Sequence, residues 1–139
     1  MLYAILCYED EKAVSRWTAE EDAACMARLD AAQQPLRDQA RLGAVLRLQN
    51  TTAAATLRKN GSQPMVLDGP FAETKEQLLG LFTVDCASLD EAMAFARELA
   101  AANPGSGCYE VRPMTYYRPG ALPDHAGEPG HGSSPRGEG

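Results

Sequence analysis

The sequence has no histidine before residue 125 and few basic residues. Both histidines, His125 and His131, lie near its C-terminal end. Acid–base chemistry in the first 118 residues must therefore use carboxylates, thiols, tyrosine or lysine. Thirteen Lys and Arg against 19 Asp and Glu give a formal net charge of −6. Because nucleic-acid binding needs a concentrated basic face, we expect no direct contact with nucleic acid.

Long apolar runs are also missing. The sequence contains no uninterrupted stretch of about 18 apolar residues, the length that a membrane-spanning helix needs. The N-terminal segment MLYAILCYEDEK has neither the basic region nor the small-residue cleavage site of a signal peptide. We therefore expect no membrane segment and a cytoplasmic location.

Metal-binding spacing is absent as well. The four cysteines, Cys7, Cys25, Cys86 and Cys108, form no CxxC pair. If Cys7, Cys86 and Cys108 met at one end of a sheet, they would suit a soft metal, but buried thiols acting as small hydrophobes are the preferred interpretation. Glu9, Asp10 and Asp85 are expected near one rim of the sheet, where three carboxylates could hold a hard cation. We interpret them instead as solvated surface groups. We expect no metal and no cofactor.

The composition changes near Arg118. Beyond it, PGALPDHAGEPGHGSSPRGEG is mostly Pro, Gly, Ser and charge, with Leu122 as its only large apolar residue. Such a segment buries too little apolar surface to offset the entropy lost on ordering. We therefore predict one domain over residues 1–118 and a flexible tail over residues 119–139.

Periodicity and turn residues divide residues 1–118 into strands and helices. Thr18 with Glu21, and Ser88 with Glu91, are capping boxes that each open a helix. We expect the first helix to run to about Ala40, with a kink or division at Pro35 and with Gly43 as its C-terminal stop. Strands are expected over residues 3–8, 44–49, 53–58, 63–67, 81–86 and 108–114, with a tight turn at Asn60-Gly61 and a short helical turn capped by Thr74.

This order predicts an α+β fold, a ferredoxin-like split βαβ with an inserted β-hairpin. Its helices would cover one face of an antiparallel sheet. The other face would need a partner, so we expect a homodimer that pairs two sheets face to face.

The segment Asp68-Gly69-Pro70-Phe71 is the strongest candidate for a functional loop. Gly and Pro cannot continue a strand, so Asp68 is expected at the mouth of a strand where a shaped loop begins. Its carboxylate could act as a general acid or base, or anchor a ligand. The alternative is a turn residue that accepts hydrogen bonds from backbone N–H groups of the loop.

The longer stretch DGPFAETKEQLLG resembles the signature of the DGPF branch of the YCII-related family, and the resemblance covers about Met1 to Tyr117. It implies a dimeric α/β barrel in which Asp68 lines a cleft. Family members pair the loop aspartate with a histidine on the first helix. The corresponding stretch here, Met26 to Asp30, has no histidine but contains Arg28. A guanidinium does not shuttle protons, so this difference favours anion binding over acid–base catalysis.

The site predicted from the sequence is a small-molecule cleft with Asp68 at its polar centre and as its tentative catalytic residue. Phe71 would anchor the loop, Tyr8 would form a wall, and Arg28 and Lys75 would attract an anionic metabolite.

Three alternatives stay open at this point. The resemblance implies an association with extracytoplasmic-function sigma factors, which suggests a non-catalytic accessory or regulatory role. It also implies proton-transfer activity of the isomerase, dehydratase or lyase type. The third alternative is a structural domain in which the loop only stabilises the fold.

Overall fold

The computed structural model describes residues 1–126 and consists of a four-stranded sheet, a helical layer and a separate two-stranded hairpin. The predicted tail begins inside this range at residue 119. Its part from residue 127 onward, with His131, lies outside the described residues. None of the described helices is long and apolar enough to cross a membrane.

The sheet has the strand order of a ferredoxin-like fold. Strands β1 (Leu2–Glu9), β2 (Leu42–Arg47), β5 (Gln77–Asp85) and β6 (Cys108–Pro113) are arranged β2-β5-β1-β6, and every neighbouring pair is antiparallel. Buried residues alternate along β1, so Tyr3, Ile5, Cys7 and Glu9 share one face. The predicted fold class is confirmed.

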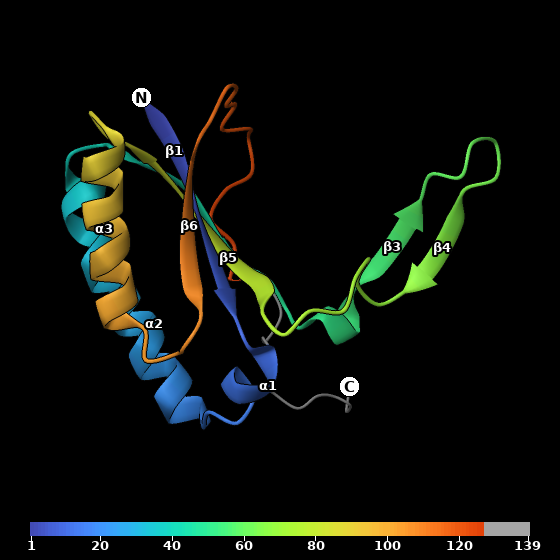
Figure 1. Cartoon of the computed structure of the whole chain (residues 1–139). Helices are drawn as coiled ribbons and strands as arrows, with labels where there is room; N and C mark the ends of the chain where they lie inside the picture. Colours follow the sequence, from blue (N-terminus) through green and yellow to red (C-terminus); the bar gives the residue numbers. More distant parts are fainter. Residues whose placement is uncertain (127–139) are drawn as a thin grey trace.

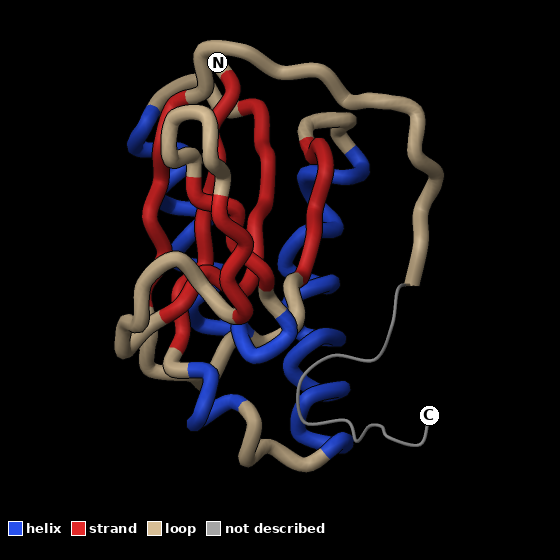
Figure 2. Tube along the Cα trace, turned by 90° about the vertical axis from the view of Figure 1, so that its right-hand side faces the viewer, coloured by secondary structure: helices blue, strands red, loops and turns tan. Residues whose placement is uncertain are grey.

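Helices cover that face (Figure 1). The covering helices are α2 (Ala19–Asp38) and α3 (Leu89–Ala102), whereas the short α1 (Glu11–Val14) follows β1 at the end of the sheet. Side chains of α2 and α3 join the buried residues of β1 and β5 in one core, in which Ile5 and Leu99 are fully buried. Figure 2 shows the sheet and helices as two layers. The opposite face of the sheet carries no helix among the described residues.

Both predicted helix starts are present. Thr18 and Glu21 form a complete capping box, whereas Ser88 accepts from the Glu91 N–H while the Glu91 carboxylate accepts from Ala87. The first helix ends at Asp38, close to the predicted Ala40, but Gly43 is not its stop because it lies in β2. The chain turns at Ala40 (φ 57°), where the Arg41 N–H donates to the Leu36 carbonyl at 2.8 Å.

The predicted division of α2 at Pro35 is also wrong, because the helix runs through it without a break. Proline removes one hydrogen-bond donor from the helix. Buried residues on both sides of it, Leu29, Gln33 and Leu36, hold the helix against the core. Tertiary packing therefore outweighs the local cost.

The inserted hairpin consists of β3 (Ala55–Arg58) and β4 (Met65–Asp68), preceded by the short helix η1 (Thr51–Ala53). Gly61 adopts a positive φ of 59° in the predicted turn. The hairpin projects from the sheet on the side away from the helices (Figure 1). The expected helical turn at Thr74 does not form, because the Thr74 hydroxyl donates to the Glu76 carbonyl and β5 begins at Gln77.

The antiparallel pairing of β1 with β5 separates residues that the sequence analysis placed together. The Cys86 N–H donates to the Met1 carbonyl at the start of β1, whereas Cys7 lies near its other end. Asp85 lies beside Met1, and Glu9 pairs with Gln77. Cys7 and Cys86 therefore do not meet at one end of the sheet, in agreement with the preferred interpretation of separate buried thiols, whereas the expected proximity of Glu9 to Asp85 is wrong. Within residues 1–126, no three His, Cys, Asp or Glu side chains form a metal-binding group.

Candidate functional site

A cavity of about 780 Å³ lies between α2 and the helix-covered face of the sheet. This volume lies within the range typical of small-molecule sites. The cavity is lined by α1, α2, β1, β2, β5 and β6, by the segments that follow α1, β2 and α3, and by the last described residues of the tail. Its lining residues are Cys7, Glu9, Val14, Trp17, Cys25, Met26, Leu29, Gln33, Val45, Leu46, Arg47, Leu48, Gln49, Leu79, Gly80, Phe82, Asn103, Tyr109, His125 and Ala126.

Most of the wall is apolar. Its apolar lining residues include Trp17, Leu29 and Phe82; Leu29 and Phe82 belong to the main core, and Trp17 packs against it. Such surfaces favour the apolar body of a ligand through water exclusion. The polar lining groups therefore determine how a ligand would be oriented.

Glu9 is the buried carboxylate of this wall. It ends the buried row of β1, and only 5% of its surface is exposed. It accepts hydrogen bonds from Asn103 Nδ2 at 3.0 Å and from the Gly107 N–H at 3.2 Å. Burial raises the pKa of Glu9, and these two hydrogen bonds oppose that rise. The side chain is thus a positioned carboxyl group whose protonated form is favoured by its surroundings.

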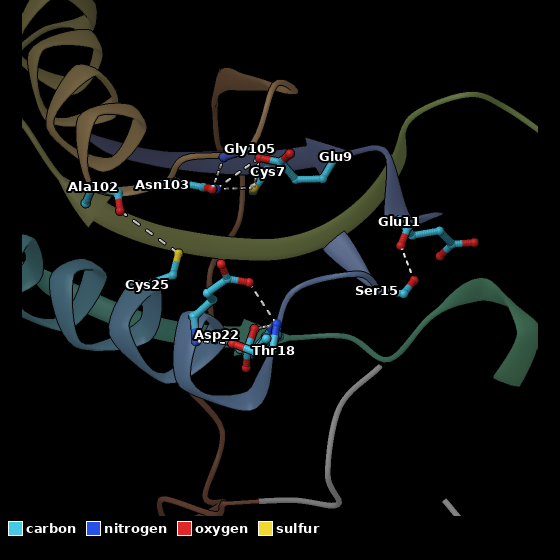
Figure 3. A network of polar contacts seen from close by, with 12 residues as sticks. Cys7, Glu9, Glu11, Ser15, Thr18, Asp22, Cys25, Ala102, Asn103 and Gly105 are labelled. Carbon is cyan, nitrogen blue, oxygen red and sulfur yellow. Dashed lines mark hydrogen bonds and ion pairs between the residues drawn. The ribbon is translucent and has the colours of Figure 1, made fainter. Parts of the chain in front are cut away.

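The turn after α3 is built closely around Glu9. Asn103 Oδ1 accepts from the Gly105 N–H at 2.9 Å, and Figure 3 shows both residues beside Glu9 and Cys7. A Cβ at Gly107 would lie 1.7 Å from the Tyr8 carbonyl oxygen, and one at Gly105 would lie 2.2 Å from Glu9 Oε1. Only glycine permits this approach of backbone to strand.

Two further titratable groups adjoin the Glu9 carboxyl. Asn103 Nδ2 also lies 3.0 Å from the Tyr109 hydroxyl, and Cys7 Sγ lies 4.0 Å from Glu9 Oε2. Burial raises the pKa of Cys7 to about 12 and raises that of Tyr109 as well. Both groups therefore stay protonated at neutral pH, and Cys7 is not activated as a nucleophile.

A guanidinium group also contributes to the wall. Arg47 on β2 binds Asp22 on α2 through two contacts, Nη1 to Oδ2 at 3.0 Å and Nη2 to Oδ1 at 2.6 Å. This bidentate pair joins the helix to the edge strand beside the cavity. The carboxylate of Asp22 therefore already occupies the position at which Arg47 would bind an anion of a ligand.

The three predicted site residues of the DGPF region lie on or after the hairpin. Asp68 ends β4 opposite Ala55 and is exposed. Phe71 is 71% exposed, and Lys75 is also exposed. All three lie apart from the residues that line the cavity.

The other two predicted residues have partners elsewhere. The Tyr8 hydroxyl donates to Glu110 Oε1 at 3.2 Å on the face of the sheet opposite the helices. Arg28 Nε donates to the Ala102 carbonyl at 2.9 Å within the helical layer. Arg28 therefore does not pair with Asp68 within one chain, since the hairpin projects on the other side of the sheet (Figure 1).

The sequence reasoning missed Glu9, Asn103 and Tyr109 as site residues. The sequence did contain a signal for Glu9. In a strand every second side chain lies on the same face, so Glu9 shares the buried face of Tyr3, Ile5 and Cys7 although it is a charged residue type. Asn103 follows α3, and Tyr109 lies on β6. Their approach to Glu9 depends on the tight glycine turn between them.

The chain is thus an α+β domain with a ferredoxin-like sheet, an inserted hairpin and a cavity beneath α2. The YCII-related domain matches residues 1–118. An uncharacterized protein of Rhizobium meliloti (strain 1021) is 58% identical over 123 residues, which cover 88% of this chain and 99% of that protein. The chain belongs to the YCII-related family.

One solved structure is similar over much of the chain. It is a 5-chloro-2-hydroxyhydroquinone dehydrochlorinase of Burkholderia phenoliruptrix AC1100, in complex with 2,5-dihydroxybenzoquinone. The similarity covers 84% of this chain and 96% of that chain, with a TM-score of 0.49 and 14% sequence identity.

Proposed function

We propose that the protein binds a small, mostly apolar molecule in the cavity between α2 and the sheet. The observation that carries this proposal is a positioned, nearly buried carboxyl group, Glu9, in the wall of a cavity of about 780 Å³. An apolar pocket with a few fixed polar groups is the usual form of a small-molecule site. The family membership is compatible with this role.

The lining groups define the ligand class. Glu9 accepts hydrogen bonds when ionised, so it would bind a hydroxyl or N–H group of the ligand. Trp17 and Phe82 suit a planar ring. Because Arg47 is already bound to Asp22, an anionic group would not be held beside it without breaking that pair. An aromatic molecule with a hydroxyl or N–H group beside Glu9 fits this part of the wall best.

Binding can be followed with a natural reporter. Trp17 is the only tryptophan of the chain and lines the cavity. We expect N-phenyl-1-naphthylamine, an apolar dye with one N–H group, to accept energy from Trp17 and to brighten on binding. Cys25→Phe, which adds a ring to the cavity wall, should abolish this signal.

A matched variant controls for dye bound elsewhere. The hairpin exposes Leu57 and Val66, so Leu57→Ser/Val66→Ser removes exposed apolar surface outside the cavity. The signal should survive this change. If the hairpin variant loses the signal and Cys25→Phe keeps it while remaining folded by circular dichroism, the proposal is contradicted.

Proton transfer is a second candidate function. The raised pKa of Glu9 in the cavity wall makes Glu9, and not Asp68, the proposed base. A carboxylate in an apolar cavity can take a proton from carbon. The probe 5-nitrobenzisoxazole tests this: the base removes its ring C–H proton, the electron pair forms the nitrile, and the N–O bond breaks to give a phenolate. Turnover should be lost in Glu9→Gln and kept in Asp68→Asn; the opposite pattern would contradict this role.

We also propose that the chain forms a homodimer through the face of the sheet without helices. Leu6 and Leu81 are paired on this face and are only partly buried. The hairpin extends beyond the same face with Leu57 60% and Val66 69% exposed. A two-stranded hairpin is marginally stable alone, so a second copy that covers it would stabilise it.

Sedimentation tests the assembly: the wild type should be dimeric, and Leu6→Glu, which places a charge in the pairing face, should be monomeric. A dimeric Leu6→Glu variant would contradict pairing through this face. The sigma-factor association and the cytoplasmic location stay predictions from the sequence.

A further inference from the structure

The cavity is reached by a segment outside the predicted domain. His125 and Ala126, from the described part of the tail, line it together with residues of α2 and β2. His125 is the only histidine in residues 1–126. The segment therefore brings to the cavity a side-chain type that the domain itself does not contain.

The path of this segment is fixed at two places before it reaches the cavity. The Met114 N–H donates to the Leu2 carbonyl at 2.9 Å, which continues the pairing of β6 with β1. Tyr117 packs against the edge strand: a Cβ at Gly43 would lie 2.7 Å from its hydroxyl. Figure 2 shows the described loop leaving the end of the molecule where the N-terminus lies and running down its side toward the opposite end.

We propose that residues 119–126 form a strap that places His125 at the mouth of the cavity, where its imidazole binds a hydrogen-bond-accepting or acidic group of the ligand. This proposal rests on the small-molecule site proposed above and adds a specificity-determining residue to it. An imidazole can both donate and accept a hydrogen bond, whereas the Glu9 carboxylate favours donor groups of the ligand.

The two residues thus define a ligand with different polar ends. The charged or titratable groups that line the cavity are Glu9, Arg47, Tyr109, His125 and the thiols of Cys7 and Cys25. Arg47 is bound to Asp22, and the thiols are buried with raised pKa values. His125 is therefore the group best suited to an acidic substituent, with the apolar walls holding the body of the ligand between it and Glu9.

Two related dyes test this assignment. N-phenyl-1-naphthylamine has no acidic group, and 8-anilinonaphthalene-1-sulfonate has the same ring system with a sulfonate. Binding of each is measured by energy transfer from Trp17 in the full chain. We expect His125→Ala to weaken binding of the sulfonate dye by about tenfold or more, as expected for one lost hydrogen bond to a charged group, with little change for the neutral dye. Asp124→Ala, a neighbouring exposed position outside the lining, is the matched control and should change neither.

A second variant tests the strap itself. Replacing residues 119–126 by a Gly-Ser sequence of equal length should weaken the sulfonate dye at least as much as His125→Ala does. Unchanged sulfonate binding in either variant, or an equal loss of both dyes in His125→Ala, would overturn the proposal. If neither dye binds the wild type, the small-molecule site itself fails, which is a separate and recognisable result.

Discussion

The side chain of Asn103 donates to the carboxylate of Glu9 at 3.0 Å, across 94 residues of sequence. This contact joins the end of α3 to the end of β1 at the wall of the cavity. Asn103 also holds the Gly105 N–H through its Oδ1 atom. One amide side chain thus fixes both the glycine turn and the orientation of the carboxyl group that we propose as the polar centre of the site.

The raised pKa of Glu9 makes stability depend on pH. The folded protein keeps a proton on Glu9 at pH values where the unfolded chain, with a pKa near 4.5, has lost it. The stabilisation from this group is therefore complete below pH 4.5 and is lost as the pH rises through the folded-state pKa. Glu9→Gln cannot titrate, so its stability relative to the wild type should increase with pH from 4.5 toward neutrality, measured by urea unfolding.

Glu110 on β6 provides a control of opposite sign. The hydrogen bond from Arg112 lowers the pKa of Glu110, so its contribution is present above the unfolded-state pKa and is lost in acid. Glu110→Gln should lose stability relative to the wild type as the pH rises. The same slope for both variants would contradict the assignment of the Glu9 shift to burial.

Gly107→Ala should destabilise the protein strongly. The added Cβ would lie 1.7 Å from the Tyr8 carbonyl oxygen, so backbone on both sides must move. We expect a loss of about 3 kcal/mol or more in the free energy of unfolding, at or above the upper end for overpacked sites. Gly80→Ala is the matched control, because its Cβ would make an ordinary contact at 3.4 Å with the Leu46 carbonyl oxygen, and it should cost about 1 kcal/mol or less. Equal losses would show that the glycine turn is not tightly packed.

The four thiols should differ in reactivity. Cys108 is exposed, while Cys7, Cys25 and Cys86 are buried, and the pKa of Cys7 is raised to about 12. Iodoacetamide at pH 7.5 should label one site per chain rapidly, by mass spectrometry, and Cys108→Ser should remove this fast phase. Rapid labelling of Cys7 in the native protein would contradict its buried, protonated state.

Asp68→Asn should leave stability almost unchanged. Within residues 1–126 the Asp68 carboxylate accepts no hydrogen bond and forms no ion pair, and the residue is exposed. We expect a change of about 0.5 kcal/mol or less, as at other exposed sites. A loss of about 1.5–3 kcal/mol, typical of lost hydrogen bonds to a charged group, would instead support the structural interpretation of this loop.

The sequence predicts the local elements of this fold better than the contacts between them. Thr18 with Glu21 marked the start of α2, because a capping box depends only on neighbouring residues. The break expected at Pro35 is overridden by burial of Leu36 and its neighbours, which involves distant segments. Local signals are thus reliable where no tertiary contact opposes them.

The candidate site shows the same limit. The DGPF motif was predicted as the site because its turn residues are contiguous in the sequence. The cavity is instead assembled from segments at both ends of the chain. Glu9 and Asn103 meet only because β1 and the end of α3 lie side by side, and His125 arrives from beyond the predicted domain. No spacing in the sequence encodes these long-range contacts.

Methyl NMR of the methionines tests the central claim most directly. Of the five methionines, Met26 lines the cavity and Met65 lies on the exposed hairpin. With 13C-methyl-labelled methionine, we expect N-phenyl-1-naphthylamine to shift the Met26 signal progressively and to leave that of Met65 unchanged. A shift of Met65 with an unchanged Met26 signal would place the ligand on the hairpin and contradict a binding site between α2 and the sheet.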